Sequence, residues 1–258
     1  MGRRRKAPQR LGGFTLLVVT CEHASNAVPR GASVLLKGAG SLLSTHRGWD
    51  RGAPPLARAM ARRFNAPLFT GAATRLLIDL NRSLERGRAF SEFTRGLDPL
   101  ARALLADRHW TPHRDAVTEE IGREVDAGGR VLHIGVHSFT PVLRGVRRNA
   151  DVGLLYDPRR ALEKSLCAAW LAALATAAPG LRCRKNYPYL GTSDGFTTTL
   201  RKRFPPDHYA GIELEVNQRL LRGGDTLDAA LTRNLLGSLA QALRDEAQEV
   251  QGGPRPGR

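Results

Sequence analysis

Apolar runs alternate with amphipathic segments over most of the 258 residues of the chain. The apolar runs are rich in β-branched residues or alternate apolar with polar positions, a pattern typical of strands. These predicted strands lie at 15–20, 75–80, 130–139, 151–156, 180–187 and 209–217.

The segments between these runs carry apolar residues at helical spacing. They predict helices at 54–64, within 97–127, at 160–177 and at 226–250. Because strands and helices alternate, we expect an α/β fold, a three-layer α/β/α sandwich with a mostly parallel mixed sheet. The length and the 41% hydrophobic content suffice for one large core, so we expect a single domain over 14–250, with basic disordered tails at 1–13 and 251–258.

The formal charge of +16 raises the question of a nucleic-acid partner. Seven of these charges lie in "MGRRRKAPQR" and "GGPRPGR", and the remaining +9 are spread along the chain, so we expect no nucleic-acid partner. No apolar run approaches the roughly 20 residues that cross a bilayer, and no signal-peptide cleavage pattern follows the first run. We therefore expect a cytoplasmic protein without a membrane partner. Its three cysteines show no CxxC spacing, which favours reduced thiols.

Candidate chemistry begins in "TCEHASNAVP", which directly follows the first predicted strand and contains Glu22 and His23. The carboxyl ends of strands are where open α/β sheets place their ligand sites. His23 is therefore a candidate site residue.

"HIGVHSFTP" contains His133 and His137 on one predicted strand. Four residues of a strand span about 13 Å, so the two imidazoles cannot share one metal ion. His137 lies at the carboxyl end of the strand and is the candidate site residue, whereas His133 is expected to be a hydrogen-bonded structural histidine.

"HRGWDRGA" places Asp50 shortly before a predicted helix. Asp50 could cap that helix or act in the site. Together with His23 and His137, its carboxylate would complete the two-nitrogen, one-oxygen ligand set of catalytic Zn²⁺ sites, which leave a fourth position for water.

Two further segments carry polar residues near strand ends. "IELEVNQ" alternates, with Glu213 and Glu215 on one side; this side is either a solvated face or, for Glu215, the position of a general base for a metal-bound water. "RLLIDLNRS" ends in Asn81 and Arg82, an amide and a guanidinium suited to a substrate carboxylate, although such an arginine can also pair with a surface acid.

Six motifs occur in an order that resembles the N-formylglutamate amidohydrolase family, whose fold is similar to that of the zinc-dependent exopeptidases. The motifs are "CEHASN.VP", "HRGWD.GA", "LLIDLNRS", "HIGVHSFTP", "YLGTSDGFTTTLR" and "GIELEVNQ", and they cover most of residues 15–220. "DLNR" is also similar to the aspartoacylase and succinylglutamate desuccinylase group, in which the Asn-Arg pair binds the substrate carboxylate.

The resemblance implies one divalent metal ion, zinc, bound by His23 and His137, with Glu215 as the base. The related exopeptidases have a glutamate three residues after the first histidine, where this chain has Asn26. Asp50 is the predicted replacement ligand and Glu22 the reserve. Asn81 and Arg82 are predicted to bind the substrate, and Arg147, Thr192 and Asp194 to line its pocket.

The implied reaction is hydrolysis of an N-acyl amino acid, most simply N-formyl-L-glutamate to formate and L-glutamate. Two alternatives remain open at the level of sequence. The first is the same metal hydrolase acting on another N-acyl amino acid or a small peptide, and the second is a non-catalytic basic binding protein.

Overall fold

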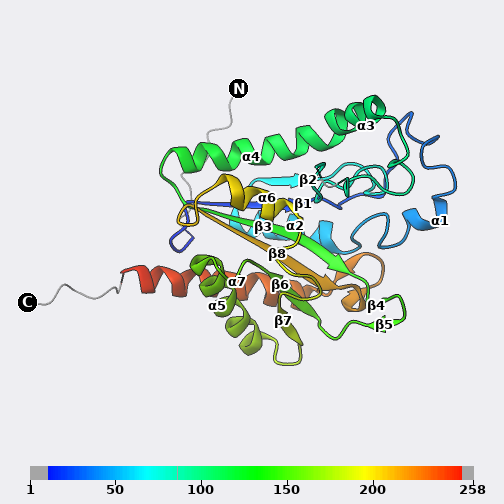
Figure 1. The fold of residues 1–258 in the computed structure, drawn as a ribbon. Helices are drawn as coiled ribbons and strands as arrows, with labels where there is room; N and C mark the ends of the chain where they lie inside the picture. Colours follow the sequence, from blue (N-terminus) through cyan, green and yellow to red (C-terminus); the bar gives the residue numbers. More distant parts are fainter. Residues whose placement is uncertain (1–10, 86, 252–258) are drawn as a thin grey trace, which may run out of the picture.

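A computed structural model describes residues 11–85 and 87–251 and is built around one six-stranded sheet (Figure 1). The strand order is β2-β1-β3-β8-β6-β7. The strands are β1 (Leu16–Cys21), β2 (Leu68–Thr70), β3 (Val131–Phe139), β6 (Val152–Leu155), β7 (Cys183–Lys185) and β8 (Tyr209–Asn217). β2, β1, β3 and β8 run parallel, whereas β6 pairs antiparallel with β8 and parallel with β7. This confirms the predicted mostly parallel mixed sheet.

Helices cover both faces of the sheet, which confirms the three-layer arrangement. α2 (Ala53–Phe64), α5 (Ala161–Ala177) and α7 (Ala229–Gln251) contribute to the largest apolar cluster, with one set of alternate strand residues. α4 (Thr111–Asp126) and α6 (Phe196–Arg203) contribute to a second cluster with residues of the opposite face. Figure 1 shows α4 and α6 on one side of the sheet and α5 and α7 on the other.

Short elements complete the structure. α1 (Gly40–Leu43) and α3 (Pro99–Leu105) contribute leucines to a separate apolar cluster, and a π-helical turn (Ala106–Trp110) joins α3 to α4. β4 (Val142–Leu143) and β5 (Val146–Arg147) form an antiparallel hairpin after β3. A 3-10 turn (Gln218–Leu220) leads from β8 into the hairpin of β9 (Leu221–Arg222) and β10 (Thr226–Leu227).

The two central strands, β3 and β8, place their histidines and glutamates on the face covered by α4 and α6. Since side chains alternate across a strand, Ile134 and Ile212 pack on the other face, in the largest cluster. The parallel register sets His137 opposite Glu215. We call this side of β1, β3 and β8 the polar face; it carries Thr20, His133, Tyr209, Glu213, His137 and Glu215.

Residues 75–80 do not form a strand, contrary to the prediction. Leu76, Leu77 and Ile78 are buried in a separate apolar cluster beside α3 and the π-helical turn, in irregular backbone. Side chains satisfy its carbonyls: Ser91 donates to the Leu76 oxygen and Thr94 to the Leu77 oxygen. A short buried apolar run has the same pattern whether it is a strand or irregular, so the pattern alone was misleading.

The predicted tails lie largely outside the described residues, which exclude 1–10 and 252–258. Residues 11–13, which the sequence places in the predicted N-terminal tail, belong to the described part of the chain. Leu11 forms a β-bridge with Phe14, and its apolar side chain packs against the largest apolar cluster. None of the helices in the described part of the chain is long and apolar enough to cross a bilayer.

Candidate active site

The predicted site residues gather at a cavity of about 310 Å³ beside the carboxyl ends of the parallel strands. Such a position is expected for a ligand site of an α/β sheet. Seven of the predicted residues line the cavity: His23, Asp50, Asn81, Arg82, His137, Asp194 and Glu215.

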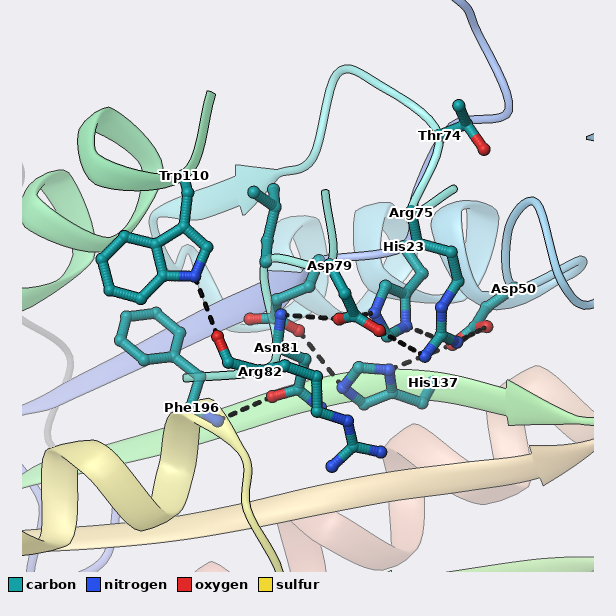
Figure 2. Close-up of polar contacts among 12 residues, drawn as sticks. His23, Asp50, Thr74, Arg75, Asp79, Asn81, Arg82, Trp110, His137 and Phe196 are labelled. Atoms are coloured by element: carbon teal, nitrogen blue, oxygen red, sulfur yellow. Dashed lines mark hydrogen bonds and ion pairs between the residues drawn. The ribbon is translucent and has the colours of Figure 1, made fainter. Parts of the chain in front are cut away.

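His23, His137 and Asp50 converge on one point (Figure 2). The Nδ1 atom of His23 lies 3.2 Å from Asp50 Oδ2, and the Nδ1 atom of His137 lies 3.0 Å from the same oxygen. One potential ligand atom from each residue lies within 4.8 Å of the others, and all three side chains are buried. Two imidazole nitrogens facing one carboxylate oxygen form a donor set that suits Zn²⁺.

The outward nitrogens of both imidazoles also face carboxylates. His23 Nε2 lies 2.7 Å from Asp79 Oδ1, and His137 Nε2 lies 3.2 Å from Glu22 Oε2. Each ring is therefore flanked by two acids. A carboxylate on the far nitrogen is the usual arrangement around metal-bound histidines, since it orients the ring and directs the other nitrogen to the metal.

These contacts separate the two candidate carboxylates. Asp50 contacts the Nδ1 atoms of both histidines, whereas Glu22 lies on the Nε2 side of His137, outside the convergent set. Asp50 also does not cap α2. The N-cap is Gly52, at a φ of 84°, and no side chain bonds the helix end there.

Arg75 joins two of the acids, and the sequence reasoning missed it. Its guanidinium donates to Asp79 at 2.6 Å and to Asp50 at 3.5 Å. Burial opposes ionisation of Asp50, yet the charge of His23, hydrogen bonds from both histidines and Arg75 hold the pKa of Asp50 below its usual range. Burial also disfavours the charged form of His137, which for a histidine lowers the pKa. The hydrogen bonds of His137 to Asp50 and Glu22 outweigh this effect and raise its pKa well above the ordinary value.

The two glutamates of β8 differ in their partners. Glu213 Oε1 accepts a hydrogen bond of 2.9 Å from the Thr197 hydroxyl at the start of α6. Glu215 is 5% exposed, and its buried Oε2 has no hydrogen-bond partner among the described residues. Burial raises the pKa of Glu215 to about 8. Glu215 is thus the uncommitted carboxylate beside His137.

The segment that carries Asn81 and Arg82 is anchored on several sides. Trp110 donates to the Arg82 carbonyl at 2.9 Å, and Arg114 donates to the Leu80 carbonyl at 3.0 Å. The Phe196 N–H donates to Asn81 Oδ1 at 2.7 Å (Figure 2), and no residue of the described chain accepts a hydrogen bond from the Asn81 amide nitrogen. Arg82 donates to the Asp194 carbonyl.

The three predicted pocket residues have different fates. Asp194 lines the cavity, and its carboxylate accepts from the Ser83 N–H at 3.4 Å. Arg147 and Thr192 do not line it, because both side chains are exposed to solvent elsewhere. Successive side chains of an extended segment point to opposite sides, and it is the next residue, Arg148, that lines the cavity.

His133 has the structural position expected of it. Its Nε2 lies 2.9 Å from the Thr20 hydroxyl and its Nδ1 2.8 Å from the Tyr209 hydroxyl, away from the cavity. Both ring nitrogens are satisfied by neutral groups, so nothing in its surroundings points to a ligand.

The motifs that build this cavity correspond to a known family. The family model described as N-formylglutamate amidohydrolase matches residues 15–222. The chain belongs to the N-formylglutamate amidohydrolase family. As a family member it is a hydrolase that acts on amides, and the match includes all of the residues that converge at the cavity.

Solved structures agree with the fold of this amidohydrolase. The gene product Atu2144 from Agrobacterium tumefaciens is 29% identical, with a TM-score of 0.75 over 93% of this chain and 92% of that one. N-formylglutamate amidohydrolase from Ralstonia eutropha JMP134 is 17% identical, with a TM-score of 0.63 over 94% and 96% of the two chains. A search of curated proteins found no match.

Proposed function

We propose that this amidohydrolase depends on one divalent metal ion, most simply Zn²⁺, and hydrolyses an N-acyl amino acid, with N-formyl-L-glutamate as the expected substrate. The observation that supports the metal dependence is that the Nδ1 atoms of His23 and His137 both lie beside Asp50 Oδ2. His23, His137 and Asp50 would hold the ion, with both histidines neutral. When bound, such an ion supplies Lewis acidity and lowers the pKa of water toward about 7.

The residues of the chain supply the remaining chemistry. Glu215 stands opposite His137 in the sheet register with a free carboxylate oxygen, so it is placed to take a proton from the attacking water and return it to the leaving amine. Arg82 and the free amide hydrogens of Asn81 line the same cavity and offer donors to a substrate carboxylate. Glu215 and Asn81 are buried, whereas Arg82 is half-buried.

The test combines elemental analysis with hydrolysis assays of the full-length protein. We expect about one equivalent of a divalent metal per chain, formate release from N-formyl-L-glutamate, and loss of this activity on chelation with recovery when Zn²⁺ is returned. A metal-free protein with full activity would contradict the metal dependence. Faster hydrolysis of another N-acyl amino acid or a small peptide would change the substrate and leave the reaction class intact.

A further inference from the structure

Arg148 differs from the other arginines that line the cavity. Arg75 is paired with Asp79 and Asp50, Arg82 contacts a carbonyl oxygen, and Arg88 is exposed. Arg148 is 8% exposed, and no carboxylate within the described residues forms an ion pair with it. Arg148 is therefore a buried cation that lines the cavity and has no counter-ion in the part of the chain that the structure describes.

Two aromatic rings and one hydroxyl hold the Arg148 guanidinium in place. It lies 5.1 Å from the ring centroid of Tyr189 and 5.6 Å from that of Phe139, and it donates to the Tyr189 hydroxyl at 2.8 Å. Its backbone N–H donates to the Pro141 carbonyl at 2.8 Å, which anchors it beside the β4–β5 hairpin. Rings orient a guanidinium but do not neutralise its charge, and a planar fork with free N–H groups suits a carboxylate.

Arg114 provides the contrast with a purely structural arginine. Its guanidinium lies 4.4 Å from the Trp110 ring centroid and 4.1 Å from that of Phe196, and it donates to the Leu80 carbonyl. Arg114 therefore braces the backbone beside Asn81 and does not line the cavity. The Arg148 guanidinium also lies beside two aromatic rings, yet it donates to no carbonyl oxygen of the described residues, and it lines the cavity.

We propose that Arg148 determines specificity by binding an anionic side-chain group of the acyl amino acid, while Arg82 and Asn81 bind the α-carboxylate. This inference rests on the proposed function. Arg82 follows the irregular segment beside the π-helical turn, and Arg148 follows β5, so the two guanidiniums come from separate parts of the wall of one cavity. The preferred substrates are then N-acyl derivatives of acidic amino acids.

The experiment compares N-formyl-L-glutamate with N-formyl-L-glutamine, which has nearly the same shape but a neutral side chain. Arg148→Gln should lower kcat/KM for the glutamate substrate on the order of 100-fold, mainly through KM, and change the glutamine substrate less than about threefold. Arg148→Lys should recover part of the loss, because it keeps the charge. Arg147→Gln is the matched control and should leave both values unchanged, since Arg147 is exposed outside the cavity.

The outcomes separate this inference from the proposed function. Equal losses of Arg148→Gln on both substrates would mean that Arg148 braces the hairpin or reads the α-carboxylate, and would overturn the inference. A wild-type enzyme that hydrolyses both substrates equally well would overturn it too, with the proposed N-acyl amino acid hydrolysis intact. A wild-type enzyme that hydrolyses neither of them, nor any other N-acyl amino acid, would overturn both.

Discussion

His133 and His137 lie on the same face of β3, both almost completely buried, but their neighbours differ in kind. His133 lies between the hydroxyls of Thr20 and Tyr209, and burial lowers its pKa to about 4. His137 lies between the carboxylates of Asp50 and Glu22, which raise its pKa well above the ordinary value despite burial. His133, at the amino end of the polar face, is therefore part of the packed interior. His137, at the carboxyl end, is part of the candidate site.

The largest expected effect is the difference between the alanine variants of the two histidines. If the proposed metal site is correct, His137→Ala should remove most of the bound metal and lower turnover by at least about 10³-fold, because nothing else on the strand would replace this proposed ligand. His133→Ala should keep the metal and cost about 1–3 kcal/mol of unfolding free energy, because the buried hydroxyls of Thr20 and Tyr209 lose their partner. Elemental analysis and denaturant unfolding of both variants check this. Full metal content in His137→Ala would remove the contrast.

The next comparison lies on β8. Glu215→Gln should keep the metal and lower turnover by about 10²-fold or more, the loss typical of a missing general base. Glu213→Gln should have a milder effect, because Glu213 is engaged with Thr197. Steady-state rates with the metal content of both variants decide the assignment. An active Glu215→Gln beside an inactive, metal-loaded Glu213→Gln would move the base to Glu213.

A smaller effect should follow from removing the carboxylate that contacts the outer nitrogen of a proposed ligand histidine. Asp79→Asn removes the carboxylate at His23 Nε2 and should weaken metal binding about 10–100-fold, as expected for an outer partner of a ligand histidine. Competition with a chromophoric chelator measures this directly. Asp98→Asn, at the exposed N-cap of α3, is the matched control and should leave the affinity unchanged. An unaltered affinity in Asp79→Asn would show that His23 needs no carboxylate behind it.

The smallest effect belongs to the amino end of the polar face. Tyr209→Phe removes the hydroxyl beside His133 Nδ1 and should cost about 1–2 kcal/mol of unfolding free energy without changing turnover or metal content. Thermal and denaturant unfolding, with rates measured on the folded enzyme, test it. A fall in turnover would mean that the two ends of the polar face are coupled.

Much of this contrast could be predicted from residue order alone. Glycine and β-branched neighbours indicate a strand through His133 and His137, and the end of that strand identifies the histidine that reaches the site. The strand through Glu213 and Glu215 can be predicted equally well, because apolar and polar residues alternate through "IELEVN". Regular strands convert sequence spacing into spatial order.

In the irregular segments, sequence spacing does not predict where the side chains lie. The buried segment around Ile78 has a strand-like composition, but its backbone is satisfied by side chains far along the chain. The choice between Asp50 and Glu22 depends on which imidazole nitrogen each one meets, and ring orientation leaves no trace in spacing. The sequence also predicts Arg147 as a pocket residue, but Arg148 lines the cavity: the two are adjacent on an extended segment, and the spacing does not show which of two alternating side chains faces the cavity.

The strand order also has a consequence for how the chain folds. β8 is the last of the six sheet strands along the chain, yet it lies between β3 and β6 in the middle of the sheet. During synthesis, β3 and β6 therefore emerge with open edges that stay unpaired until residues 209–217 are available, and such edges invite association with other chains. Closing the sheet needs contacts between distant residues, which slows folding. We expect chains that end before β8 to aggregate, and the six-stranded sheet to form only after β8 has been synthesised.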